Sequence, residues 1–417
     1  MPRQSEADEA CEFSRAGADS IETASYRRAR MLERGSRLDE MKRQPPVRRG
    51  TRDRVHRLFS AVSAARTGRP AVEYIGIDVH KNESQICLLT DDGEIIERRV
   101  ATRRDRLAEA LGSRSRARIV IESSTESEWV ARCLENLGHE VVVADPNYAP
   151  MYATRSRRVK TDRRDAQALM DACRLGAYRA AHRTSDEQRR VRALLITRDT
   201  LVRSRTRIIQ VLRSLLRREG IRVRTGEAVY FARRLAEVEL TPWLSSLASP
   251  LVAVLESVNH ELGSIEKVLK GVVESDANVR RLCSVPGIGP VTAAAFVSTL
   301  DRVERFRSAH EVEAYLGLVP REYSSGERRQ LGALTKAGNS RVRWLLVEAS
   351  WIILRTKGEN TLALREWAGR VALRRGRSIA VVALARRLAG ILYAMWRDKQ
   401  EFAPLSARKQ SQQTAAA

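Results

Sequence analysis

Short apolar runs alternate with segments of helical periodicity between residues 71 and 181, a pattern that predicts a mixed sheet covered by helices. The runs at 74–77 and 119–121 are too short for helices and are typical of buried strands. Segments 84–90 and 94–101 flank Asp91-Asp92-Gly93, which is typical of a β-hairpin turn. The remaining predicted elements are a helix over residues 103–112, a strand ending at Glu122, a helix over 126–137 and a strand over 140–144.

Residues 185–275 have a different period, which predicts long helices. The apolar residues that recur every seven positions are Leu194, Leu201, Ile208 and Leu215, followed one position later by Leu195, Val202, Ile209 and Leu216. A later set with alternating spacings of four and three comprises Leu251, Leu255, Val258, Leu262, Ile265, Leu269 and Val272. Both sets are typical of coiled-coil seams, and we interpret them as an antiparallel helical hairpin. The seam can pack within one chain or against a second subunit.

Residues 280–400 are predicted to form a mainly helical third domain. Its first motif is Val-Pro-Gly-Ile-Gly-Pro, in which Gly287 and Gly289 free the backbone to approach a phosphate. A helix that begins at Pro290 would point its N-terminus at that phosphate. The motif therefore predicts a helix-hairpin-helix DNA-binding element, and a plain corner between two helices is the alternative.

The whole chain is thus predicted to be multidomain, with an α/β part followed by an all-α part. Three early strands and then alternating helices and strands is the order of a ribonuclease H-like domain, which we assign to residues 71–181. Residues 1–70 lack sustained periodicity and are predicted to be a disordered basic extension, unless translation starts at Met41 or later. Residues 401–417 are predicted to be a disordered tail.

The composition of the chain indicates what kind of partner the protein binds. The chain has 417 residues and a formal net charge of +24, which favours nucleic acid as the neutralising polyanion. An anionic membrane surface is the alternative partner. The codon bias of a GC-rich genome also raises the arginine content, and we interpret the charge as the result of both causes. The late apolar segment around 379–396 is interrupted by Arg386 and Arg387, so it predicts a buried helix and no membrane span.

The five scattered cysteines and the first residues of the chain indicate the cellular compartment of the protein. The cysteines form no C-x-x-C pair, and we interpret them as reduced core thiols. The first residues are charged and lack an apolar core segment, so no signal peptide is predicted. A cytoplasmic location follows from both observations.

Four carboxylates are the candidate metal-binding and catalytic residues. Asp78 and Glu122 each end a predicted strand, and Asp162 and Asp165 lie three residues apart at the start of a predicted helix, hence on one face. Acids in these places can converge on Mg²⁺, or on Mn²⁺, because both ions take oxygen ligands. Two such ions could clamp the attacking and leaving oxygens of a phosphodiester. The alternative is that Thr161 or Asp162 caps the helix and the remaining acids form solvated ion pairs.

Six motifs in order carry a resemblance to a known family: GIDVHKNESQI, IVIESS, VKTDRRDAQAL, SVPGIGPVTAAA, GLVPREYSSG and LTKAGNSRVRWLLVEAS. The chain resembles the DEDD transposases of the insertion-sequence one-ten family, also called bridge-RNA-guided recombinases, over about residues 72–400. The resemblance implies a RuvC-like domain whose acids are Asp78, Glu122, Asp162 and Asp165, a coiled-coil linker and a C-terminal transposase domain. It also implies a serine nucleophile, Ser325 or alternatively Ser324.

The resemblance further implies the partners. These are DNA at the element ends and the target, a non-coding bridge RNA that acts as guide, and further copies of the chain in a dimer or tetramer. We expect the protein at the bacterial nucleoid. The residues expected to contact nucleic acid are Gly287, Gly289, Lys160, Arg163, Arg164, Arg328, Arg329, Lys336, Arg341 and Arg343.

Two other functions fit the same residues. A junction-resolving nuclease would use the acids with water as nucleophile, and would leave Ser325 with a structural role. A nucleic-acid-binding protein without activity would use the acids as caps and ion-pair partners. A covalent bond between protein and DNA distinguishes the recombinase from both alternatives.

Overall fold

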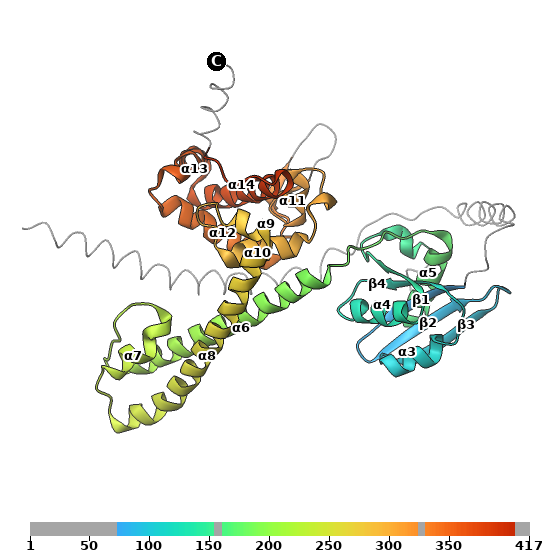
Figure 1. The fold of residues 1–417 in the computed structure, drawn as a ribbon, viewed down its shortest axis with the longest axis horizontal. Coiled ribbons are helices and arrows are strands. Elements are labelled where there is room, and N and C mark those ends of the chain that lie inside the picture. The colour runs from blue at the N-terminus through green and yellow to red at the C-terminus, as the bar shows by residue number, and fades with distance from the viewer. Residues whose placement is uncertain (1–72, 154–160, 324–329, 405–417) are drawn as a thin grey trace, which may run out of the picture. The chain divides into compact units, whose positions relative to one another are not determined.

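A computed structural model describes residues 73–153, 161–323 and 330–404 (Figure 1). The chain divides into two compact units, the first ending at Arg183 and the second beginning at Thr184. Residues 185–275 and 280–400, which the sequence assigns to separate domains, lie in the same second unit. The predicted extension, residues 1–70, lies outside the described residues.

A five-stranded mixed sheet forms the centre of the first unit. Its strands are β1 (Tyr74–Val79), β2 (Glu83–Leu89), β3 (Ile95–Ala101), β4 (Arg118–Glu122) and β5 (Glu140–Ala144), arranged in the order β3-β2-β1-β4-β5. The β1–β2 and β2–β3 pairs are antiparallel, whereas the β1–β4 and β4–β5 pairs are parallel. The strands lie where the apolar runs predict them, and Gly93 makes the predicted turn between β2 and β3 with φ of 84°.

Helices cover both faces of this sheet. On one face, α3 (Arg104–Leu111) and α4 (Ser127–Asn136) contribute side chains to a core with Ile75 and Ile77 of β1. On the other face, α5 (Asp162–Leu175) packs against β1, β2 and β4. Because side chains alternate along a strand, Gly76 and Asp78 point to the face that α5 covers.

Gly76 explains how closely α5 approaches the sheet. A Cβ atom at this position would lie 2.2 Å from the Ala166 carbonyl oxygen and 2.2 Å from the Met170 nitrogen, both in the backbone of α5. Real Cβ atoms do not approach backbone so closely, so residue 76 must lack a side chain for the helix to dock. This contact brings the start of α5 to the edge of the sheet where β1 ends.

Two long helices begin the second unit. They are α6 (Asp186–Arg218) and α8 (Pro242–Ser275), joined through the short η2 (Ala228–Tyr230) and α7 (Phe231–Ala236). The early part of α6 shares a core with Leu269 near the end of α8, and the late part of α6 shares a core with Ala248 near its start. The two helices therefore run antiparallel, as predicted. Their buried heptad positions include Leu195, Ile209 and Leu216 in α6 and Leu255, Leu262 and Leu269 in α8.

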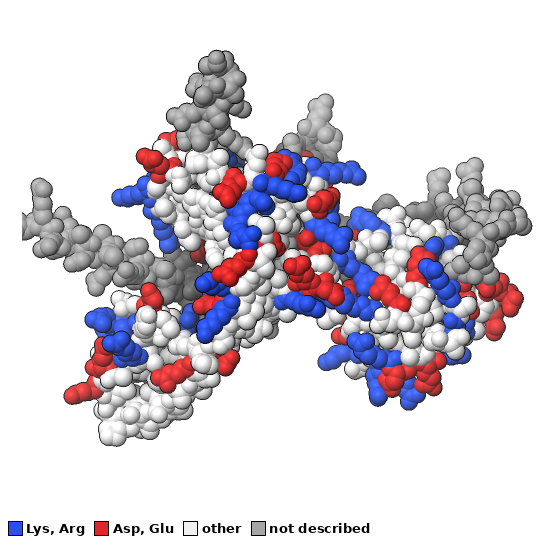
Figure 2. Space-filling view, viewed as in Figure 1, with Lys and Arg blue, Asp and Glu red and all other residues white. Residues whose placement is uncertain are grey.

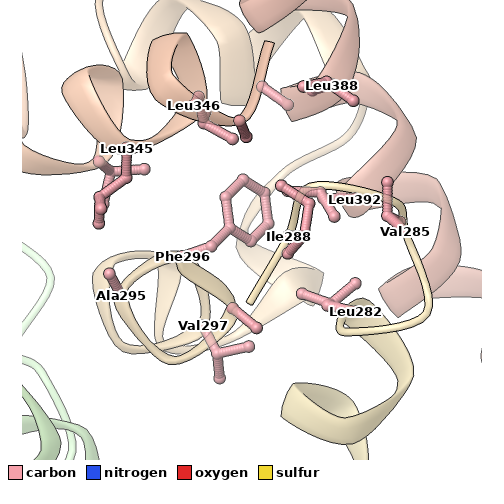
Figure 3. Close-up of a cluster of buried hydrophobic side chains, with 14 of the residues drawn as sticks. Leu282, Val285, Ile288, Ala295, Phe296, Val297, Leu345, Leu346, Leu388 and Leu392 are labelled. Atoms are coloured by element: carbon pink, nitrogen blue, oxygen red, sulfur yellow. The ribbon is translucent and has the colours of Figure 1, made fainter. Parts of the chain in front are cut away.

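The rest of the second unit is mainly helical. Its helices are α9 (Ala277–Leu282), α10 (Pro290–Leu300), η3 (Val303–Arg305), α11 (Ala309–Tyr315), α12 (Ser340–Arg355), η4 (Glu359–Thr361), α13 (Leu362–Arg375) and α14 (Arg377–Asp398). Phe296 of α10 points into the shared core beside Ile288 and Leu392 (Figure 3). Phe402, within the predicted tail, also packs against this core, and residues 405–417 lie outside the described residues.

Helix α14 is the one described helix that is long and apolar enough to cross a membrane by length and composition. Of the most apolar 18-residue window of this helix, 50% is buried inside the protein. Leu384, Leu388 and Leu392 are each fully buried and belong to the core around Phe296. These contacts are those of a core helix, as its sequence predicts.

A short hairpin precedes α12. Strands β6 (Pro320–Glu322) and β7 (Leu331–Leu334) are antiparallel, and the Tyr323 nitrogen donates a hydrogen bond of 2.8 Å to the Gln330 carbonyl. The six residues that join Tyr323 to Gln330 include Ser324 and Ser325, and they lie outside the described residues.

The described cysteines are free thiols, as predicted. Cys87, Cys133 and Cys173 are buried, and Cys283 is partly buried. Burial raises the pKa of the Cys87 thiol to about 11 and that of the Cys173 thiol to about 12. Both thiols are therefore protonated and unreactive at neutral pH.

Candidate active site

Two of the predicted acids lie at one edge of the sheet because of strand order and register. β1 and β4 are parallel neighbours, and Ile77 pairs with Ile121. Asp78 and Glu122 therefore follow at adjacent positions, at the carboxyl ends of both strands. Val120 packs in the core beneath α5, so Glu122, two residues later, points to the same face as Asp78.

The other two predicted acids lie in the first turn of α5. Thr161 is the N-cap, and its side chain accepts a hydrogen bond of 3.4 Å from the Arg164 nitrogen. Asp162 is exposed, whereas Asp165 is buried with 5% of its surface accessible. The capping role that the sequence left open thus belongs to Thr161. We call Asp78, Glu122, Asp162 and Asp165 the acidic edge.

The pKa of Asp78 depends on its burial and on the charges around it. Burial raises the pKa of the Asp78 carboxyl above its usual range, and the nearby His80 partly opposes this rise. The negative charges of Asp165, Asp162 and Glu122 raise the pKa further, in that order of size. All three carboxylates therefore lie near enough to Asp78 for electrostatic repulsion.

His80 lies at the acidic edge, although the sequence pattern did not single it out. Its Nε2 atom is 3.2 Å from a carboxylate oxygen of Asp78 and 3.6 Å from one of Asp162. One ligand atom from each of these three residues lies within 4.8 Å of the others. The available signal was its position two residues after Asp78, just beyond the end of β1.

Tyr152 is the second residue that sequence reasoning missed. It ends η1 (Ala149–Tyr152), a short turn between β5 and α5, and its hydroxyl donates a hydrogen bond to the Glu122 carboxylate. The two residues are 30 positions apart in the chain, so no local pattern marks the contact. The hydrogen bond holds one oxygen of the Glu122 carboxylate in place.

These residues fit a divalent cation. Carboxylate oxygens are the ligands that Mg²⁺ and Mn²⁺ prefer, and the desolvation and mutual repulsion around Asp78 would be relieved by a bound positive charge. Asp78, Asp162 and His80 are the residues whose ligand atoms the structure brings within 4.8 Å of one another. Glu122 and Asp165 lie near enough to raise the pKa of Asp78.

The predicted nucleic-acid contacts have varied surroundings. Arg163 forms an ion pair with Glu97 of β3, and the Arg164 backbone nitrogen bonds to the Thr161 cap. Lys336 is exposed, with a left-handed φ of 54°. Lys160, Arg328 and Arg329 lie outside the described residues, as do both candidate serines.

Two of the predicted arginines bond inside the protein. The Arg341 guanidinium donates a hydrogen bond of 2.6 Å to the Leu195 carbonyl in α6. The Arg343 guanidinium bonds to the carbonyls of Leu316, Ala337 and Gly338 at 2.9, 3.3 and 3.1 Å. These side chains hold α12 to its neighbours, so their availability to phosphate is limited.

The two predicted glycines join α9 to α10. Gly287 has φ of 82°, and a Cβ there would lie 3.0 Å from the Ala349 carbonyl oxygen of α12. Gly289 is the N-cap of α10, and a Cβ there would meet nothing within 4 Å. Packing against α12 thus explains Gly287, whereas Gly289 leaves open space before the helix.

Comparison with known proteins identifies the class. Residues 75–220 match a family model for a DEDD transposase, described as "Transposase", and residues 279–364 match one described as "Transposase IS116/IS110/IS902 family". The first match contains the acidic edge, and the second contains α10 and the segment with the candidate serines. The chain is therefore a DNA transposase, an enzyme that moves DNA segments.

Curated relatives support the same class. A protein of Coxiella burnetii, "Transposase for insertion sequence element IS1111A", is 29% identical over 356 residues, covering 84% of this chain and 96% of that protein. A "Probable family 20 transposase" of Pseudomonas aeruginosa is 31% identical, covering 66% and 83% of the two chains. The transposase of IS1328 from Yersinia enterocolitica is 29% identical, covering 78% and 97%. The chain belongs to the IS110 family of transposases.

Proposed function

We propose that the chain cleaves and rejoins DNA strands at the ends of an insertion sequence, with the acidic edge as its metal site. The observation that carries the proposal is the convergence of two strand ends and one helix start on a single face of the sheet. In this proposal the first unit is a RuvC-like domain, consistent with its β3-β2-β1-β4-β5 strand order. Mg²⁺ is the expected ion, with Mn²⁺ as a substitute.

The acidic edge would position the reacting phosphate. A bound divalent ion supplies Lewis-acid stabilisation of the charge that develops on phosphate oxygens. Asp78 and Glu122 are fixed by the sheet, Asp165 is buried in α5, and Tyr152 restrains Glu122. This rigidity matters because catalytic groups must be held in place before the reaction.

The nucleophile in our proposal is Ser325, with Ser324 as the alternative. The serine oxygen would attack phosphorus, the bond to the adjacent DNA oxygen would break, and the serine proton would end on that leaving oxygen. The resulting phosphoserine ester conserves the bond energy, so a DNA hydroxyl can reverse the step and join strands without ATP. The family membership of residues 279–364 supports this assignment.

Nucleic acid is the partner that the charge supports. On the face of each unit drawn in Figure 2, Lys and Arg side chains lie among Asp and Glu side chains. With a net charge of +24, the whole chain attracts phosphates over a longer range than any single contact. The helix-hairpin-helix interpretation of α9 and α10, and a guide RNA that pairs with DNA, belong to the same proposal.

Self-association and location complete the proposal. Helices α6 and α8 form a seam with each other, and Ile196, Val254 and Val268 remain exposed on them. We propose that this coiled-coil hairpin contributes to a dimer or tetramer, and that the protein acts in the cytoplasm at the nucleoid.

Covalent trapping tests the proposed reaction. The purified chain is incubated with Mg²⁺, DNA spanning the element junction and RNA transcribed from the element's flank, and a denaturing gel detects protein bonded to DNA. We expect an adduct that disappears in Asp162→Asn and in either Ser325→Ala or Ser324→Ala. Asp105→Asn and Ser264→Ala are matched controls, because Asp105 is an exposed acid in the first turn of α3 and Ser264 an exposed serine in α8.

The other outcomes separate the alternative functions. Cleaved DNA without an adduct would indicate a hydrolytic, RuvC-like endonuclease that uses the acidic edge with water. An adduct that persists in Asp162→Asn would show that the reaction does not require the acidic edge. RNA-bound protein that gives no product with Mg²⁺ or Mn²⁺ would contradict the proposed chemistry.

A further inference from the structure

We infer that His80 is a nitrogen ligand of the metal site and raises the affinity of that site for Mn²⁺ relative to Mg²⁺. This inference rests on the proposed function of the acidic edge as a metal site. It adds a fifth residue to the four carboxylates, and it predicts a property, ion selectivity, that the carboxylates alone would not give.

The first argument is distance. Ligands at 2.0–2.1 Å from an octahedral ion are separated from their neighbours by about 3 Å. The His80 Nε2 atom lies 3.2 Å from Asp78 and 3.6 Å from Asp162, so it occupies nearly the spacing of an adjacent ligand to both. The third separation, between the ligand oxygens of Asp78 and Asp162, is within 4.8 Å.

The second argument is how the backbone of His80 is held. Its nitrogen donates a hydrogen bond of 3.3 Å to the Glu83 carbonyl, and its own carbonyl accepts one of 2.8 Å from the Thr102 hydroxyl. Thr102 in turn shares a buried hydrogen bond of 2.8 Å with Ser84. These bonds fix the turn after β1, so the histidine is anchored beside Asp78 even though its side chain is 57% exposed.

The third argument is chemical. Mg²⁺ strongly prefers oxygen ligands and keeps its waters, whereas imidazole nitrogen suits transition-metal ions. A nitrogen among carboxylates therefore favours Mn²⁺ relative to Mg²⁺. A histidine that acts as a counter-cation for Asp78 and Asp162 makes the opposite prediction, because its removal would tighten the binding of both ions alike.

Metal binding to the full chain tests the inference without reference to activity. Mn²⁺ affinity is measured from the paramagnetic resonance of the free ion, and Mg²⁺ affinity by its competition. In His80→Asn we expect Mn²⁺ affinity to fall about tenfold or more and Mg²⁺ affinity to change less than about threefold. Pulsed resonance of bound Mn²⁺ should show nitrogen coupling in the natural chain and lose it in His80→Asn.

Two further variants complete the design. His310→Asn is the matched control, because His310 is an exposed histidine 3.4 Å from the Glu313 carboxylate in the second unit, and it should bind both ions as the natural chain does. Asp78→Asn tests the metal site itself and should weaken the binding of both Mn²⁺ and Mg²⁺. Circular dichroism confirms that each variant is folded, as expected for the exposed His80.

The outcomes separate the inference from the proposed function. Unchanged or tighter Mn²⁺ binding in His80→Asn, or bound Mn²⁺ without nitrogen coupling, overturns the role of His80. If Asp78→Asn loses metal binding in the same experiment, the proposed metal site still stands. Mn²⁺ binding in Asp78→Asn equal to that of the natural chain overturns the metal site as proposed, whatever His80 does.

Discussion

The acidic edge of the first unit and the basic residues of the second unit differ in what determines the surroundings of their side chains. The acids lie where strand order places them, at the adjacent ends of β1 and β4 and the start of α5. Of the basic residues, Arg341 and Arg343 donate hydrogen bonds to backbone carbonyls within the protein. Sheet topology gathers residues at one edge, whereas an arginine on a helix can serve either packing or a ligand.

The strongest test of this comparison is Gly76→Ala. The added Cβ would meet the backbone of α5 at 2.2 Å, so α5 must move away from β1. We expect the free energy of unfolding of the first unit to fall by at least about 3 kcal/mol, at the upper end of overpacking effects. Denaturant unfolding followed by circular dichroism measures the change.

Gly263→Ala is the control for that variant. Gly263 lies in α8 with open space around its Cβ position, and alanine there should leave stability unchanged or raise it by up to about 1 kcal/mol. Gly76→Ala with natural stability would show that α5 does not dock on β1 as described.

Asp78→Asn should have opposite effects on activity and on stability. Strand cleavage should fall at least about 100-fold, as for the loss of other preorganised charge-stabilising groups. In EDTA at neutral pH the variant should be more stable than the natural chain, because burial, followed by the neighbouring carboxylates, raises the pKa of Asp78 and makes its ionisation unfavourable.

The pH dependence checks that explanation. Below the unfolded value of about 3.9, Asp78 is protonated in both states and the stability difference should vanish. As the pH rises through the raised pKa of the folded state, the natural chain should lose stability relative to Asp78→Asn. Equal stability of the two chains at every pH in EDTA would mean that Asp78 is not strained by its neighbours.

Tyr152→Phe should have a moderate effect. The variant keeps the ring of Tyr152 but removes the hydrogen bond to Glu122. We expect the concentration of Mg²⁺ that gives half-maximal cleavage to rise about tenfold, with a smaller change in the rate at saturating metal. Tyr148→Phe is the control, and a similar shift there would argue against a specific contact.

Arg343→Ala and Lys336→Ala sharpen the other side of the comparison. Arg343 bonds to three carbonyls, so its loss should cost about 1–2 kcal/mol of stability and leave the salt dependence of DNA binding unchanged. Lys336 is exposed, and its loss should leave stability unchanged and reduce the salt slope of binding by about 1 if it contacts a phosphate. The reverse result would show Arg343 to be a phosphate contact.

Much of this fold could be predicted because local pattern determines it. The strands around Asp78 and Glu122 are short buried runs, and the spacing of Asp162 and Asp165 places them on one helical face. The antiparallel α6–α8 pair follows from its heptads, whose buried positions include Leu255 and Leu262.

The missed features depend on tertiary contacts. Gly76 looks like an ordinary strand residue until α5 crosses it, and Tyr152 reaches Glu122 from a turn 30 positions away. Arg341 resembles a phosphate ligand in sequence, yet its partner is the carbonyl of Leu195, 146 positions earlier. Spacing along the chain contains no information about such partners.

Iron-directed cleavage of the protein tests the central claim, the convergence of the acidic edge, most directly. Fe²⁺ replaces Mg²⁺ in the full chain, and ascorbate with peroxide generates radicals that cut the backbone near the bound ion. We predict cuts near residues 78–80, 122 and 162–165, which excess Mg²⁺ suppresses and Asp78→Asn abolishes. Cuts confined to one of these segments, or cuts that persist in Asp78→Asn, would contradict a shared metal site.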